Sequence, residues 1–261
     1  MRHIAILFAV ILFVSCTNDN MYMSDNDDDY WSKEQLLNTS GLGLYPFVPF
    51  TEAEMRTLPY DVKLERRQIP ESFLRNMSTK ALFYQFVYTD LSKSMLMFNT
   101  MQQGFETVTG QLNMLPELLD RPDAGHVLLE ILQKVDPAKI NGSDCFWFFD
   151  CLQMISAQPE VISSMSDTDI DSYVLQQIRC HDAIRSLAKT DENWSYPESV
   201  GGILLGLGNV MFMYEFEPFL QLLEKDPGTN KPVYRGDGMA RSEQKALQII
   251  DCAKQFNLQN L

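Results

Sequence analysis

The sequence predicts an all-α protein built from many helices. Apolar residues recur at helical spacing along most of the chain after residue 78. Helix-capping residues precede many of these segments, and glycines or prolines separate them. Convincing alternating strand patterns are absent from the sequence. Helices of about 10–25 residues joined by short loops favour an irregular multi-helix bundle or stacked α-hairpins.

A solenoid-like arrangement remains an open alternative for the helical region. Leu128-Leu129-x-Ile131-Leu132 resembles Leu222-Leu223 only loosely, and no fixed repeat period is visible. The sequence therefore does not decide between a bundle and a solenoid.

The chain begins like a signal peptide. Arg2 and His3 form a short positive region, and residues 4–14 are an apolar run of eleven residues. A helix that spans a bilayer needs about 20 apolar residues, so this run is too short to be one. We therefore expect residues 1–15 to be a signal peptide.

The segment that follows resembles the lipobox of bacterial lipoproteins. It reads Phe13-Val14-Ser15-Cys16, with a small residue directly before the cysteine. The resemblance implies cleavage before Cys16, acylation of its thiol and amine with chains such as palmitate, and a membrane as partner. Phe13 departs from the usual leucine, and a secretory signal with an incidental cysteine is the alternative. Two or three acyl chains, at about 0.8 kcal/mol per buried CH₂, would hold the protein on a membrane.

Residues 16–31 are polar and acidic, and we interpret them as a tether. Asp25-x-Asp27-x-Asp29 suggests a calcium loop, but Tyr30 and Leu36 stand where such a loop needs Gly and Glu. Residues 32–261 have a suitable length for a single all-helical domain.

Composition and charge narrow the functional classes. The net charge of −14 argues against nucleic acid as a partner, because its phosphates require basic patches. Besides Cys16 the chain holds Cys145, Cys151, Cys180 and Cys252. Cys145 and Cys151 would lie about 9 Å apart along one helix, which exceeds disulfide reach. The other pairings stay open, and buried free thiols are the interpretation that we favour.

The first part of the domain is expected to hold short helices. Residues 32–37 begin with a capping box, and residues 41–50 form a turn-rich apolar connector that we expect to pack across the domain. Thr51-x-x-Glu54 opens another short helix, which Pro59 ends. The charged run at residues 63–67 is expected to be a solvated loop or helix face.

From residue 78 the sequence predicts helix after helix. Ser78-Thr79 caps the first of them, Gly104 separates or kinks two others, and Pro116 is expected to start a new turn. Further helical segments are expected at 91–98, 105–115, 123–135, 145–157, from Pro159, and at 170–189, 199–223 and 242–256. Ser143-Asp144 and Ser166-Asp167-x-Asp169 are the expected caps of two of these segments.

Two of the predicted helices are expected to be buried. Apolar residues spread around much of the segment 145–157, and residues 200–213 hold one polar position. Gly201-Gly202 and Gly206-x-Gly208 lack the strand and the remaining residues of a nucleotide-binding loop. We interpret these glycines as sites where two helices approach closely.

The candidate binding residues are two aromatics. Trp194 and Tyr196 lie in a polar loop, Thr190 to Pro197, where we expect them to be exposed and available to a partner. Arg235-Gly236-Asp237 spells an adhesion tripeptide, which we interpret as a chance occurrence.

No catalytic or metal-binding residues are assigned from the sequence. Cys180 and His181 are adjacent, so they cannot share a helix face and do not form a ready metal site. The hydrolase motifs G-x-S-x-G and H-E-x-x-H do not occur in the sequence. Glu215 and Glu217 would diverge by about 200° on a helix. No motif points to a cofactor.

Three segments resemble a recurring pattern in uncharacterised lipoproteins of the Bacteroidetes. They are Ser78-Thr79-Lys80-Ala81-Leu82, Met101-Gln102-Gln103-Gly104-Phe105 and the run from Leu115 to Ala124, about a fifth of the chain. The resemblance implies a helical fold and an envelope location, and it carries no activity.

Together these observations predict a lipid-anchored envelope lipoprotein, held on the outer membrane at its periplasmic or surface face. Its helical domain is expected to bind or scaffold a protein or glycan partner. The alternative is a lipid-anchored hydrolase of glycans or peptides that uses carboxylates from separate helices.

Overall fold

The computed structural model describes residues 39–89, 91–140, 142–234 and 242–259. Within these residues the protein has thirteen α-helices and no β-strand, which confirms the all-α prediction. The α-helices are α2 (Glu52–Thr57), α3 (Tyr60–Glu65), α4 (Glu71–Leu74), α5 (Thr79–Tyr88), α6 (Met101–Thr109), α7 (Met114–Leu119), α8 (Ala124–Leu132), α9 (Ser143–Ser156), α10 (Pro159–Ser163), α11 (Asp167–Leu187), α12 (Gly201–Met213), α13 (Glu217–Leu220) and α14 (Glu243–Gln259). Three 3₁₀ helices join them, η2 (Ser92–Met97), η3 (Pro137–Lys139) and η4 (Glu198–Val200).

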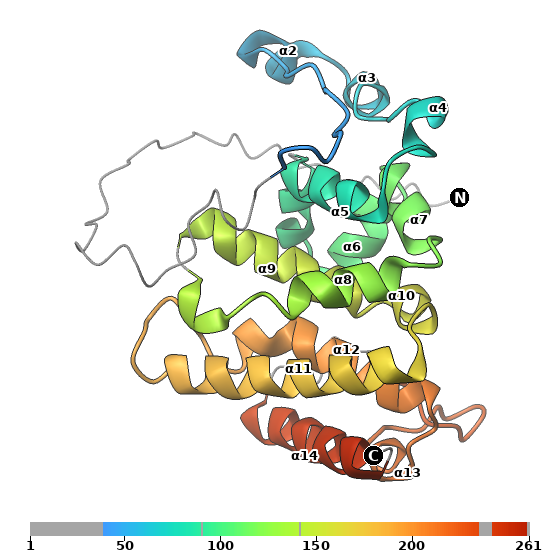
Figure 1. Ribbon diagram of the computed structural model, residues 1–261, viewed down its shortest axis with the longest axis vertical. Coiled ribbons are helices and arrows are strands. Elements are labelled where there is room, and N and C mark those ends of the chain that lie inside the picture. Colours follow the sequence, from blue (N-terminus) through green and yellow to red (C-terminus); the bar gives the residue numbers. More distant parts are fainter. Residues whose placement is uncertain (1–38, 90, 141, 235–241, 260–261) are drawn as a thin grey trace, which may run out of the picture.

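The helices form layers that follow one another along the chain (Figure 1). Helices α5 and α7 contact each other, and α5 contacts α8 and α9 in the next layer. Helices α8, α9 and α10 contact α11 or α12, and α14 packs on both α11 and α12. Segments that are close in sequence are thus close in space, as in a stack of α-hairpins.

Helices α2, α3 and α4 lie at the end of the molecule opposite α14 (Figure 1). We call residues 39–77 the N-terminal layer, because the connector at 39–50 leads into these helices. The connector packs on the core through partly buried side chains, as expected, but Val48 is 72% exposed. Its partly buried side chains are Leu42, Leu44, Tyr45 and Phe47.

A polar clasp joins the N-terminal layer to the rest of the domain. The Asn113 side chain accepts a hydrogen bond from the Ile69 N–H (3.1 Å) and donates one to the Ile69 carbonyl (2.7 Å). In return, the Gln68 side chain accepts from the Asn113 N–H (3.0 Å) and donates to the Gln111 carbonyl (2.8 Å). The clasp satisfies buried backbone groups that an apolar contact would leave unpaired.

Several helix starts lie where the capping residues indicate. Thr51 and Glu54 form a capping box at α2, and Ser166 and Asp169 form another at α11. Ser78 caps α5. In each case a side-chain oxygen accepts a hydrogen bond from a backbone N–H of the first turn, which would otherwise lack a partner.

Other boundaries differ from the prediction. Gly104 lies inside α6 and does not separate two helices. A Cβ there would overlap the backbone of Met95 in the preceding segment, which explains why this position is a glycine. Pro116 is the third residue of α7, where the missing N–H costs nothing. The segment at 91–98 forms the 3₁₀ helix η2, and Gly142, not Ser143 or Asp144, caps α9.

The two helices expected to be buried are buried. Most of α9 and α12 is inaccessible to solvent. A Cβ at Gly202 would lie 2.8 Å from Gln153 Cβ of α9, and a Cβ at Gly206 would overlap the Tyr173 hydroxyl of α11. The glycines therefore allow the close helix approach that the sequence predicts. No helix in the described part of the chain is long and apolar enough to cross a membrane.

The four cysteines after Cys16 are free and buried, which confirms the favoured interpretation. Some predictions fall outside the described residues: the signal peptide, Cys16, the tether, the helix at 32–37 and the tripeptide at 235–237.

Candidate functional site

The loop from Thr190 to Pro197 connects α11 to α12 through η4, and Trp194 anchors it in the core. The indole is only 4% exposed, and its ring centroid lies 4.8 Å from Phe146 and 6.1 Å from Phe149 on α9. The expectation that Trp194 is exposed is therefore wrong. Edge-to-face packing in an aromatic cluster stabilises the buried indole, so its polar sequence neighbours are no guide to its position.

Tyr196, the second candidate residue, is partly buried at the surface of the same loop. Its hydroxyl lies 3.1 Å from His181 Nε2 of α11, and the two rings meet edge to face with centroids 5.6 Å apart. The Arg185 guanidinium lies 5.8 Å from the centre of the tyrosine ring. Helix α11 thus holds Tyr196 through two side chains one helical turn apart.

His181 is buried, with its side chain 1% exposed, and Nδ1 lies 2.9 Å from Asp182 Oδ1. Burial lowers the pKa of His181 below its usual value, and the Asp182 carboxylate opposes that shift. We assign a neutral ring whose Nδ1–H donates to Asp182 and whose Nε2 accepts from the Tyr196 hydroxyl. Both ring nitrogens are therefore engaged.

Two ion pairs between α11 and α14 surround this contact. Arg185 lies 3.5 Å from Glu243, and Lys254 lies 3.5 Å from Asp182. These four side chains are between 42% and 59% exposed, so each pair contributes about 0–1 kcal/mol to stability. They give the rim around Tyr196 charges of both signs.

The arrangement suits binding better than nucleophilic catalysis. A nucleophilic hydroxyl needs an accessible base and a lowered pKa. Here burial raises the pKa of Tyr196, and the imidazole is enclosed. A rigid aromatic side chain with an arginine beside it is instead typical of residues that dominate binding interfaces. We call Tyr196, His181, Asp182 and Arg185 the Tyr196 site.

The two acidic residues considered as a pair do not lie on one helix. Glu215 has a φ of 50° in the link between α12 and α13, and Glu217 is the first residue of α13. The predicted helical run at 199–223 is therefore interrupted. Within the described residues, no group of three or more His, Cys, Asp or Glu side chains could hold a metal ion.

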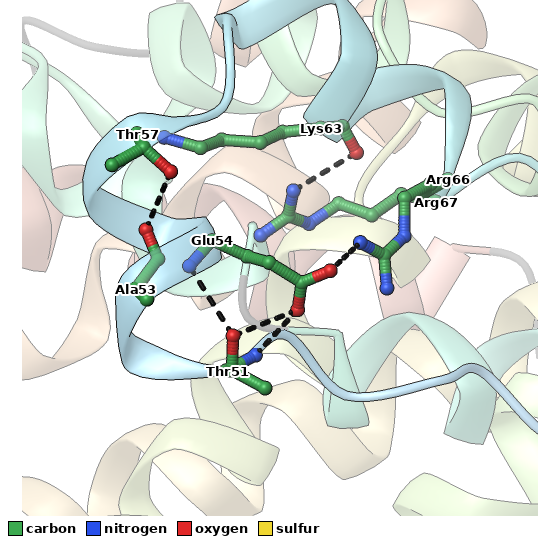
Figure 2. A network of polar contacts seen from close by, with 7 residues as sticks. All are labelled: Thr51, Ala53, Glu54, Thr57, Lys63, Arg66 and Arg67. Atoms are coloured by element: carbon green, nitrogen blue, oxygen red, sulfur yellow. Dashed lines mark hydrogen bonds and ion pairs between the residues drawn. The ribbon is translucent and has the colours of Figure 1, made fainter.

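A second polar cluster orders the N-terminal layer (Figure 2). The guanidinium carbons of Arg66 and Arg67 lie 4.3 Å and 4.5 Å from the centre of the Phe50 ring. Glu54 accepts hydrogen bonds from the Thr51 N–H and Oγ1, both at 2.9 Å, and from Arg66 Nη1 at 2.8 Å. These contacts, the backbone bond from Thr51 first, lower the pKa of Glu54 to about 2.

The same cluster corrects the expectation for residues 63–67. Arg67 is only 6% exposed, and its Nη1 donates to the Lys63 carbonyl at 3.0 Å. Stacking on Phe50 and a backbone acceptor allow the guanidinium to be buried. Segments α2 and α3 are thereby fixed around one aromatic ring.

Sequence reasoning considered His181 only as a metal ligand and missed its contact with Tyr196. The two residues are 15 positions apart and in different elements, so no spacing rule connects them. No family model, curated protein or solved structure that was compared with the chain matches it.

Proposed function

We propose that this protein is a lipid-anchored lipoprotein of the cell envelope whose helical domain binds or scaffolds a protein or glycan partner at the Tyr196 site. One observation carries the binding role. The Tyr196 ring is held in place by His181 and Arg185 on α11 while remaining partly accessible. A side chain that is already ordered loses little conformational entropy when a partner covers it.

The anchor in this proposal comes from the sequence Phe13-Val14-Ser15-Cys16 and the apolar run before it. Acyl chains on Cys16 would keep the domain on the outer membrane, at its periplasmic or surface face. The layered fold supports a scaffolding role, because stacked helices expose an extended surface relative to their core.

Cell fractionation tests the anchor. The wild-type protein should sediment with membranes and resist extraction by high salt. Replacing Cys16 by Ala should release the protein into the soluble fraction, since the acylated thiol is lost. Retention of the Cys16→Ala protein on membranes would show that the anchor is assigned incorrectly.

Site-specific crosslinking tests the binding role. A photoreactive phenylalanine analogue at position 196 should capture a discrete partner in intact cells. The same analogue at Glu106, an exposed residue on α6, serves as the matched control. Arg185→Ala should weaken capture from position 196, because it removes the cation beside the ring. Equal capture from positions 196 and 106 would contradict a partner at this site. Capture from position 196 that Arg185→Ala leaves unchanged would contradict it as well.

A further inference from the structure

The N-terminal layer exposes several apolar and aromatic side chains to solvent. The exposed fractions are 72% for Val48, 43% for Met55, 54% for Tyr60 and 36% for Phe73. We call these four residues the apolar set. Terminal layers of stacked helical proteins usually present a polar outer face, because they have no further layer to cover them. This end layer departs from that rule.

The N-terminal layer differs from the rest of the chain in charge. Residues 39–77 contain five acidic and five basic side chains, whereas residues 78–261 contain 24 acidic and 14 basic ones. An anionic lipid surface repels the acidic layers and leaves the neutral layer free to approach. Arg56 and Arg75 have 69% and 72% exposed side chains, and each pairs with a glutamate one helical turn earlier, Glu52 and Glu71. Their long stems let the guanidinium exchange that carboxylate for a lipid phosphate.

The position of the layer relative to Cys16 points in the same direction. Twenty-two residues lie between Cys16 and Thr39, so a connecting chain of at most about 80 Å joins this layer to Cys16. The chain then packs at this end of the domain. The Tyr45 N–H donates to Gln85 Oε1 at 2.7 Å, and the Tyr45 ring lies 5.2 Å from Phe73 of the apolar set.

We infer that the N-terminal layer docks on the surface of the bilayer that holds Cys16, with the apolar set among the lipid headgroups. This inference rests on the proposed lipid anchor. Aromatic and apolar residues with arginines beside them are the composition of segments that lie in a membrane interface. Docking orients the stack so that α14, at its opposite end, points away from the bilayer (Figure 1).

The test uses the mature chain from residue 16, coupled through the Cys16 thiol to a maleimide lipid. The vesicles contain phosphatidylethanolamine and phosphatidylglycerol, and the other four thiols are buried and do not compete. Hydrogen exchange of the coupled chain is compared with that of the chain in solution. We expect amides of α2 and α3 to exchange about tenfold more slowly on vesicles, with α14 unchanged.

Charged substitutions supply the matched comparison. Val48→Asp with Met55→Asp should abolish the slower exchange, whereas Leu258→Asp, at a 73% exposed position on α14, should leave it intact. An unchanged exchange rate in α2 and α3 on vesicles would overturn the inference. The inference would also be overturned if exchange in α2 and α3 slowed without vesicles as the protein concentration rises. That result would show that a second copy of the chain covers the N-terminal layer. The vesicle experiment attaches Cys16 to lipid chemically and does not need acylation in the cell. Its result is therefore independent of the fractionation test with Cys16→Ala.

Discussion

At the residue scale, His181 combines complete burial with two polar partners. A buried imidazole is tolerated when it is neutral and both nitrogens are hydrogen-bonded, as Asp182 and Tyr196 ensure here. It lies on α11 and contacts Tyr196 in the loop at 190–197, so it supports that side chain. The protonation state of His181 therefore affects the stability of the fold around the Tyr196 site.

Stability should depend on pH through His181. Because burial lowers its pKa in the folded protein, the unfolded chain binds the proton more readily. The contribution of His181 to the free energy of unfolding should therefore fall as pH decreases below about 6.5, the usual histidine value. Desolvation raises the pKa of Asp150 to about 6, so this carboxyl contributes in the opposite direction over the same range. Urea unfolding of wild type and His181→Asn at pH 7.5 and 5.5 isolates the His181 contribution, because only wild type should lose it at the lower pH. An undiminished change in His181→Asn would assign the pH dependence to other groups.

Tyr196→Phe tests the Tyr196 hydroxyl separately from the aromatic ring. The substitution keeps the ring beside Arg185 but removes the hydroxyl that donates to His181 Nε2. Loss of this hydrogen bond should lower the free energy of unfolding by about 0.5–1.5 kcal/mol. Urea unfolding of Tyr196→Phe and wild type at pH 7.5 provides the measurement. Identical midpoints would show that the hydroxyl does not stabilise the loop.

At the scale of elements, the capping residues and glycines predicted much of what the structure shows. Thr51, Ser78 and Ser166 act through residues three positions away, so their effect is readable from local sequence. The burial of Trp194 depends on α9, more than 40 positions earlier. Contacts over such separations leave no local pattern, which explains why its exposure was predicted wrongly.

The close approach of α12 to α11 should make Gly206 intolerant of a side chain. A Cβ at this position would overlap the Tyr173 hydroxyl, so Gly206→Ala should cost about 1–3 kcal/mol of stability. Tyr173→Phe combined with Gly206→Ala should recover part of the loss. Gly110→Ala is the control, because its nearest neighbour would lie at 3.5 Å, an ordinary contact. Equal midpoints in denaturant for Gly206→Ala and wild type would disprove the overlap.

The clasp should control how firmly the N-terminal layer is attached. Asn113→Ala leaves the N–H and carbonyl of buried Ile69 without their partner, at a cost of about 1–3 kcal/mol. Exchange of amides in α4 should accelerate. Asn76→Ala is the matched control, since Asn76 is exposed and bonds only within its own helical turn. If both variants exchange alike, the clasp does not hold the layer.

At the scale of the whole molecule, the layers follow chain order, and this explains what the sequence could and could not predict. Helical periodicity indicated the all-α class, but the stacking depends on which helix faces meet. The glycines of α12 indicated close helix contacts without naming Gln153 or Tyr173 as the neighbours. Likewise, the polar loop indicated Tyr196 as a candidate binding residue. Its contact with His181 is visible only in the folded structure.

We propose that the mature protein begins at an acylated Cys16 and presents its helical domain from a membrane. Mass spectrometry of the protein purified from cell membranes tests this claim most directly. The N-terminal peptide should begin at Cys16 and carry the mass of two or three acyl chains. An N-terminal peptide that begins at Met1, or an unmodified peptide that contains Cys16, would contradict the account.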